Sequence, residues 1–208
     1  MTVGLVVEIE ELVFDTLTMR TDALQLALTL EGVPVTHAVV RRAHGGATAA
    51  MALDALGATA VMDAVTRDLV LARTATAMRA ILDRGTPSFD AIVRDRLAEL
   101  SAEYPISIVT RGATADARRM LEESGLDACV RTVRTLGDLP ASAQHGVWAE
   151  ARARMFTDRC IAVARRPLLP AARRAGFSTI AIDEASAEND ATLVSLAQLD
   201  ASFLLSVS

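Results

Sequence analysis

Two glutamates behind a short apolar run are the residues of this sequence best placed to do chemistry. Glu8 and Glu10 follow the run Leu5 to Val7 and are separated by one residue. On an extended backbone, residues i and i+2 point to the same side, so both carboxylates would face one site. Paired carboxylates act as metal ligands or as a general acid and base. The alternative is that both are acids at the solvent end of a strand.

A hydroxyl and a guanidinium follow a second apolar run. Thr110 and Arg111 come directly after Ile106 to Val109. The backbone N–H groups of a following helix and a permanently charged arginine are groups that bind anions. Thr110 itself either takes part in such a site or only caps the turn. The sequence therefore predicts that Arg111 could bind an anion at this turn.

These candidates need strands that end side by side. Apolar runs predict strands at 5–7, 106–109, 129–133, 160–164, 179–182 and 203–207. Helical periodicity between most of them predicts alternating α and β units, and hence an α/β fold with a doubly wound parallel sheet. Open parallel sheets bind ligands beyond the carboxyl ends of their strands, where the candidate residues lie.

The segment 16–84 carries no strand signal. Apolar spacing predicts four helices there, at 21–31, 36–42, 48–56 and 60–83. We therefore predict a core domain at 1–15 and 85–208, and an all-helical domain at 16–84. His44 lies in a glycine-containing break between two of these helices. It either faces a cleft between the two domains or belongs to a simple helix-joining turn.

The first segment resembles the opening motif of the haloacid dehalogenase superfamily, in its beta-phosphoglucomutase-like phosphatase branch. That motif has an apolar run, Asp-x-Asp-Gly, and a closing Asp-Ser or Asp-Thr. The closing pair matches Asp15-Thr16. Glu8, Glu10 and Glu11 stand where the family has its nucleophilic Asp, its acid/base Asp and its Gly. The later landmarks of the family follow in order over nearly the whole chain.

The resemblance implies a Rossmann-like core, a helical cap and a site for small phosphorylated metabolites. Thr110 matches the family's Ser or Thr that binds a phosphoryl oxygen, and His44 lies where the cap has a substrate-specificity loop. The family also uses a Lys and a pair of acids that holds Mg²⁺. All 21 basic residues here are Arg, and no acid occurs between Asp158 and Asp183. Arg165-Arg166 occupies the turn where the metal-binding acids belong.

These departures predict that the chain binds no metal and no cofactor, and that it is a noncatalytic member with a binding or partner-interaction role. The alternative is a hydrolase or phosphatase with altered residues, acting on a small phosphorylated metabolite with Mg²⁺. We further predict that Arg165 or Arg166 pairs with Glu8 or Glu10 in the vacant metal position. Arg111 would then remain for a small anionic ligand in the core–cap cleft.

Composition limits the remaining classes. The net charge of −5 weighs against a nucleic-acid partner. No apolar run reaches the roughly 18–20 residues of a membrane span, and no secretory signal is expected. Two cysteines form no disulfide framework, so we expect a cytoplasmic protein. The apolar helices of 16–84 leave a homodimer or a protein partner open.

Overall fold

The computed structural model describes residues 2–57, 62–137, 139–182 and 191–207. Within these residues, six parallel strands form one sheet in the order β3-β2-β1-β4-β5-β6. The strands are β1 (Val3–Glu8), β2 (Ile106–Thr110), β3 (Val130–Thr135), β4 (Arg159–Ala164), β5 (Ser178–Ile182) and β6 (Ala191–Leu193). This confirms the predicted α/β class and parallel sheet. Because β1 lies between β2 and β4, Glu8 at its end has neighbouring strands on both sides.

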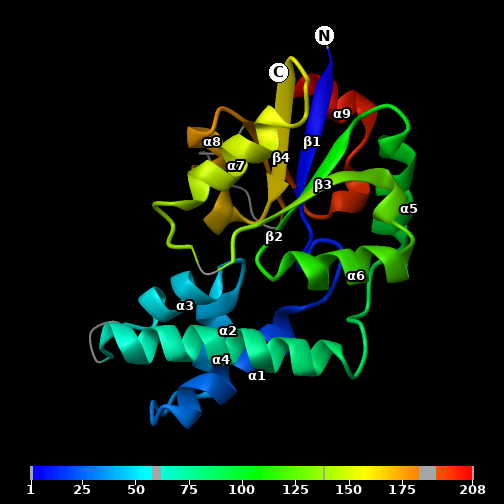
Figure 1. Cartoon of the computed structure of the whole chain (residues 1–208). Coiled ribbons are helices and arrows are strands. Elements are labelled where there is room, and N and C mark those ends of the chain that lie inside the picture. Colours follow the sequence, from blue (N-terminus) through cyan, green and yellow to red (C-terminus); the bar gives the residue numbers. More distant parts are fainter. Residues whose placement is uncertain (1, 58–61, 138, 183–190, 208) are drawn as a thin grey trace.

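Helices cover both faces of the sheet (Figure 1). One face packs on α5 (Ala91–Ser101), α6 (Thr114–Ser124) and α9 (Ala201–Ser206), and the other on α7 (Gln144–Ala153) and α8 (Leu169–Arg174). Every residue of β1 is buried, with Leu5 and Val7 in one hydrophobic cluster and Val6 in the other. A strand that is covered on both faces needs apolar residues at every position, which explains the continuous run in the sequence.

Four helices follow β1 and pack against one another beside the sheet (Figure 1). They are α1 (Leu17–Leu30), α2 (His37–His44), α3 (Ala49–Ala55) and α4 (Ala64–Leu82), here called the α1–α4 unit. The unit has a hydrophobic cluster of its own, which includes Leu24, Leu28, Leu53 and Val70. Helices lie where the sequence predicted them, although positions 60 and 61 of the fourth prediction fall outside the described residues. The division into two domains stays a prediction.

The strand predicted at 203–207 is wrong, because this segment contains helix α9. Asp200 caps the helix: its carboxylate accepts a hydrogen bond of 2.7 Å from the backbone N–H of Phe203. A short apolar run fits a strand or a helix equally well by periodicity, and the cap decides between them. The edge position is instead taken by β6, a strand that we did not predict.

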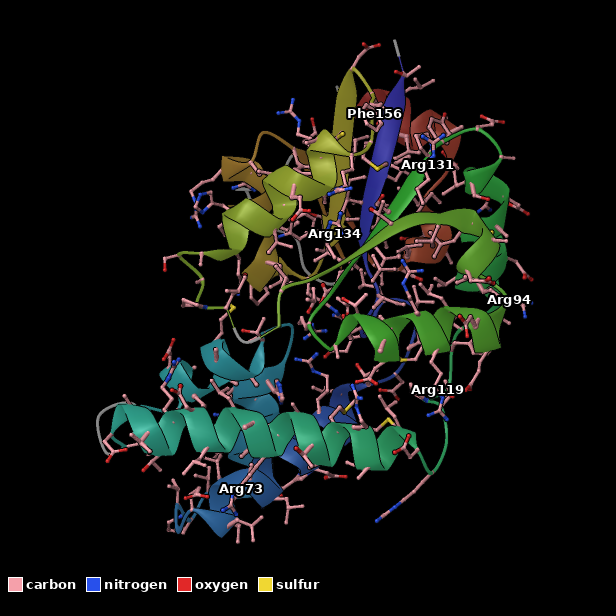
Figure 2. All side chains as sticks on the ribbon, in the orientation of Figure 1. Arg73, Arg94, Arg119, Arg131, Arg134 and Phe156 are labelled. Atoms are coloured by element: carbon pink, nitrogen blue, oxygen red, sulfur yellow. The ribbon has the colours of Figure 1, made fainter. Side chains whose placement is uncertain are left out.

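Phe156 lies at the end of the sheet opposite Glu8, near the start of β1 and far from the α1–α4 unit, with 88% of its surface exposed (Figure 2). Every helix in the described part of the chain is too short or too polar to cross a lipid bilayer.

Candidate functional site

Glu8 is held rigidly at the end of the central strand. Its side chain is fully buried, Oε2 accepts a hydrogen bond of 2.7 Å from the backbone N–H of Arg165, and Oε1 lies 2.6 Å from Nε of Arg111. Burial raises the pKa of Glu8 to about 7, with a further increase from the nearby charge of Glu10 and a decrease from Arg111. Glu8 therefore holds its proton near neutral pH far more strongly than an exposed glutamate does.

Glu10 places its carboxylate in a ring of donors. Oε1 accepts hydrogen bonds from Oγ1 of Thr110, from the backbone N–H of Arg111 at 2.9 Å and from the backbone N–H of Gly112 at 3.1 Å. Thr110 ends β2, and helix α6 begins just beyond it, so the chain turns there with its N–H groups facing inward. We call these three donors the anion cradle. In this structure the acceptor in the cradle is a carboxylate of the chain itself.

Glu11 has a backbone conformation that favours glycine. Its φ angle is 62°, in the left-handed region, where a non-glycine residue costs roughly 1–2 kcal/mol. Its side chain turns inward: Oε1 lies 3.0 Å from Nη2 of Arg111, and Oε2 accepts a 3.3 Å hydrogen bond from the N–H of Gly46. A glycine would relieve the strain but would supply neither contact. The glutamate thus adds a third carboxylate to the site.

Arg111 is the cation at the centre of these carboxylates. Its side chain is fully buried and contacts Glu8 and Glu11 directly, while Nε lies 3.9 Å from Oε2 of Glu10. Burial alone would lower the pKa of Arg111, but the charges of Glu8, Glu11 and Glu10 outweigh it and raise that pKa. Nη1 also donates a 3.2 Å hydrogen bond to the carbonyl of Ala47 in the α1–α4 unit. Arg111 therefore ties the end of the sheet to that unit.

A second buried arginine approaches from helix α1. Nη1 of Arg20 lies 4.0 Å from Oε1 of Glu10, and Nη2 donates to the carbonyl of Ala47 at 2.9 Å. Burial, reinforced by the charge of Arg111, lowers the pKa of Arg20 to about 10. The guanidinium remains protonated at neutral pH. Glu8, Glu10, Glu11, Arg20 and Arg111 together form what we call the charged cluster.

His44 contacts this cluster as a neutral side chain. Burial, with the charges of Arg20 and Arg111, lowers the pKa of His44 to about 2. Nη2 of Arg20 lies 3.2 Å from Nε2 of His44, and a guanidinium can only donate, so Nε2 accepts and Nδ1 carries the proton. Within the described residues, Nδ1 has no hydrogen-bond partner. The position places His44 beside the site, as one of the two sequence interpretations expected.

A cavity of about 590 Å³ lies between the α1–α4 unit and helix α6. Glu10, Arg20, His44, Thr110 and Arg111 border it, so the charged cluster forms part of its wall. Much of the remaining lining consists of alanine, methionine and leucine side chains from α4 and α6. Cavities of roughly 300–1,000 Å³ accommodate drug-sized ligands. The geometry therefore offers a binding cavity with compensated charges at one side.

Known structures show the same architecture. Beta-phosphoglucomutase from Clostridium difficile aligns with a TM-score of 0.76 at 11% identity, over 100% of this chain and 97% of that chain. CbbY from Rhodobacter sphaeroides, in complex with phosphate, aligns with a TM-score of 0.74 at 15% identity, over 96% of both chains. A haloacid dehalogenase-like hydrolase from Streptococcus pneumoniae aligns with a TM-score of 0.70 at 16% identity, over 92% of this chain and 93% of that chain. The chain has the haloacid dehalogenase fold. No protein-family model matches the sequence, and no curated protein does.

The residues at this end of the sheet do not fit the Mg²⁺ that the fold family implies. Mg²⁺ needs several oxygen ligands in near-octahedral geometry. Here the guanidinium of Arg111 already lies between the carboxylates of Glu8 and Glu11, at 2.6 Å and 3.0 Å. Among the described residues, no group of three or more His, Cys, Asp or Glu side chains is arranged to hold a metal ion. These groups support no step that passes through Mg²⁺.

The arginine beside Glu8 and Glu10 is not the one that the sequence suggested. We predicted a side chain from Arg165 or Arg166 there, with Arg111 left for a ligand, whereas Arg111 itself lies between the carboxylates. Arg165 contributes its backbone N–H to Glu8, and its guanidinium donates a 3.3 Å hydrogen bond to the carbonyl of Glu11. Arg166 is exposed. Both strands that flank β1 end near Glu8, so sequence order alone cannot decide which arginine turns inward.

Two members of the charged cluster were not among our sequence candidates. Glu11 was noted only as a departure from the family's Gly, yet a charged residue at a glycine position is itself a signal. Arg20 lies on the buried stripe of α1 with Leu24 and Ala27. An arginine at positions i−4 and i−7 from buried apolar residues signals a charge that must find a partner inside.

Proposed function

We propose that this chain is a noncatalytic protein with the haloacid dehalogenase fold, which uses its cavity for binding. One observation carries the proposal: the carboxylate of Glu10 accepts the hydrogen bonds of the anion cradle, formed by Thr110 and the N–H groups of Arg111 and Gly112. The family resemblance places a phosphoryl oxygen at that hydroxyl. A phosphate ester would therefore have to displace a carboxylate of the protein itself.

The place of the activating cation is also filled from within. Phosphoryl transfer depends on positioned cations that neutralise the charge of the transferred group. In this chain Arg111 is buried, and its positive charge is compensated by the carboxylates of Glu8 and Glu11, at 2.6 Å and 3.0 Å. For a substrate, neither the anion cradle nor the guanidinium of Arg111 is free. This supports a binding role rather than turnover.

One observation favours the alternative, a hydrolase with altered residues. The pKa of Glu8 is raised to about 7 by burial, which is the range in which a carboxyl group works as a general acid or base. Against this, the side chain of Glu8 is fully buried, and both oxygens already have donors next to them. The hydrolase interpretation requires the charged cluster to open first.

The deciding experiment measures turnover of p-nitrophenyl phosphate with and without Mg²⁺, together with calorimetric titration of Mg²⁺. We expect no hydrolysis above the buffer rate and no saturable binding of one Mg²⁺ per chain. Glu8→Ala serves as the control variant, because any contaminating phosphatase would be unaffected by it. Hydrolysis that is lost in Glu8→Ala would establish the enzyme and refute the proposal.

The other roles expected from the sequence remain part of the proposal. A homodimer or a protein partner through the apolar helices of the α1–α4 unit is compatible with exposed Leu26, Leu30 and Val65. Cys129 and Cys160 are free thiols, as suits the expected cytoplasmic location. The contacts of Thr110 and Arg111 weigh against the small anionic ligand that we expected at those two residues.

A further inference from the structure

Part of the cavity lining is apolar and adaptable. These side chains are Ala75, Met78 and Leu82 on α4, Ala117 and Met120 on α6, and Ala113, which caps the start of α6. Methionine is flexible and polarisable, so it can pack against apolar ligands of different shapes. Ala75 and Ala113 are solvent-exposed, which shows that the cavity can be reached from outside. These walls favour a ligand with hydrocarbon or aromatic surface.

The charged side of the cavity offers little to an anion. The charged cluster holds three carboxylates and two guanidiniums, so its net charge is −1 when all are ionised and zero when Glu8 is protonated. The side chains of Arg111 and Arg20 are 0% and 7% exposed. A second anion placed next to Glu10 would be repelled, and moving it out of water without a free cation is unfavourable.

The remaining charges of the lining form a pair across the cavity. Nη2 of Arg79 on α4 lies 3.5 Å from Oδ1 of Asp116 on α6, and the Arg79 side chain is 57% exposed. The pair therefore lies near solvent and neutralises itself. It bridges the same two helices that supply the apolar walls. A ligand can place a neutral polar group beside it while its apolar body fills the interior.

We propose that the cavity binds a neutral, largely apolar small molecule and discriminates against phosphate esters and other anions. The inference rests on the proposed binding function, and it replaces the phosphorylated ligand of the family resemblance by one of a different chemical class. The compensated charges supply the selectivity, because each arginine among the described lining residues has a carboxylate within 4.0 Å. The apolar side chains of α4 and α6 supply the affinity.

A matched pair of fluorescent probes tests the ligand class. N-phenyl-1-naphthylamine is neutral, and 8-anilinonaphthalene-1-sulfonate carries the same ring framework with an added negative charge. We expect the neutral probe to bind saturably at one site per chain, and the sulfonate to bind at least about tenfold more weakly. Millimolar inorganic phosphate or glucose 1-phosphate should displace neither. Equal or tighter binding of the sulfonate, or displacement by phosphate, would overturn the proposal.

Tryptophan substitutions locate the site. Ala75→Trp and Ala113→Trp fill the cavity from opposite walls at exposed positions, and each should weaken binding of the neutral probe by about tenfold or more. Ala80→Trp is the control, since Ala80 is exposed on the same helix as Ala75 and does not line the cavity. If the neutral probe binds all three variants as it binds the wild type, the site is elsewhere and the proposal is wrong.

The two proposals fail separately. Hydrolysis that depends on Glu8 would refute the noncatalytic function whatever the probes do. If there is no hydrolysis and the neutral probe fails to bind saturably, the ligand class is wrong while the noncatalytic assignment stands.

Discussion

Replacing Glu10 by alanine should convert the self-occupied anion cradle into a site for an added anion. The change leaves the hydroxyl of Thr110 and the N–H groups of Arg111 and Gly112 without the carboxylate. The N–H of Gly112 keeps a 3.0 Å hydrogen bond to Oγ1 of Thr110, so two donors lose their acceptor. A buried unsatisfied donor costs about 1–3 kcal/mol, which predicts a loss of roughly 2–6 kcal/mol in the free energy of unfolding.

Inorganic phosphate should restore much of this loss. An anion that binds only the folded state stabilises it by about 2.7 kcal/mol at a concentration of 100 times Kd. For a chain of 208 residues that corresponds to roughly 5–11 °C in Tm, at about 2–4 °C per kcal/mol. Fluorescence of Trp148, which is fully buried and the sole tryptophan, reports unfolding. Phosphate is compared with chloride at equal ionic strength.

The wild type and Glu10→Gln provide the controls. Phosphate stabilises most proteins slightly by exclusion from their surface, so only the difference between variants is informative. Glutamine keeps an oxygen that can accept from the cradle, and we expect Glu10→Gln to lose less stability and to respond to phosphate as the wild type does. Equal phosphate responses of the wild type and Glu10→Ala would show that Glu10 does not occupy an anion site.

Three further perturbations probe the same region. Arg111→Met should lower the free energy of unfolding in urea by about 3–5 kcal/mol, because it leaves buried carboxylates uncompensated. Arg119→Met is the control and should lower it far less, because the ion pairs of Arg119 are exposed. The pKa of Glu8 is raised from 4.5 to about 7 in the folded state, so the folded state binds this proton more tightly than the unfolded state does. Protonation of Glu8 therefore contributes up to about 3 kcal/mol to the free energy of unfolding; this contribution is complete below pH 4.5 and is lost as the pH rises through about 7. Urea unfolding at pH 5 and pH 7.5 should show this loss of stability in the wild type and not in Glu8→Gln. An equal loss in both proteins would show that Glu8 is not the group that titrates. Gly46 and Gly32 both have a positive φ, which disfavours alanine, but only at Gly46 would the new Cβ lie 2.9 Å from a neighbouring side-chain carbon. The Tm of Gly46→Ala should therefore fall clearly further than the Tm of Gly32→Ala.

The fold could be predicted from the sequence because its signals are local and repeated. The continuous apolar run of β1 fits a strand buried on both faces, and the alternation of apolar strands with amphipathic helices fits a parallel sheet. The helices of the α1–α4 unit follow from apolar spacing and from breaks at glycine and proline. The error at 203–207 arose because a short apolar run does not by itself separate a strand from a helix.

The placement of Glu8 and Glu10 at one end of the sheet was also available from the sequence, because their spacing and the end of β1 fix it. The missing Lys and the missing acids after β4 could be counted directly. From these absences the sequence indicated that a cation must come from elsewhere in the chain. It could not show which one.

That choice belongs to the tertiary structure. Arg111 and Arg165 follow the two strands that flank β1, and both begin within reach of Glu8. The turn after β2 sends the guanidinium of Arg111 inward, whereas the turn after β4 presents the backbone N–H of Arg165. The carboxylate of Glu10 lies in the anion cradle, and the left-handed backbone of Glu11 brings a third carboxylate beside Arg111. Distances of a few tenths of an ångström decide such contacts, and they are set by packing between segments about 100 residues apart in the chain.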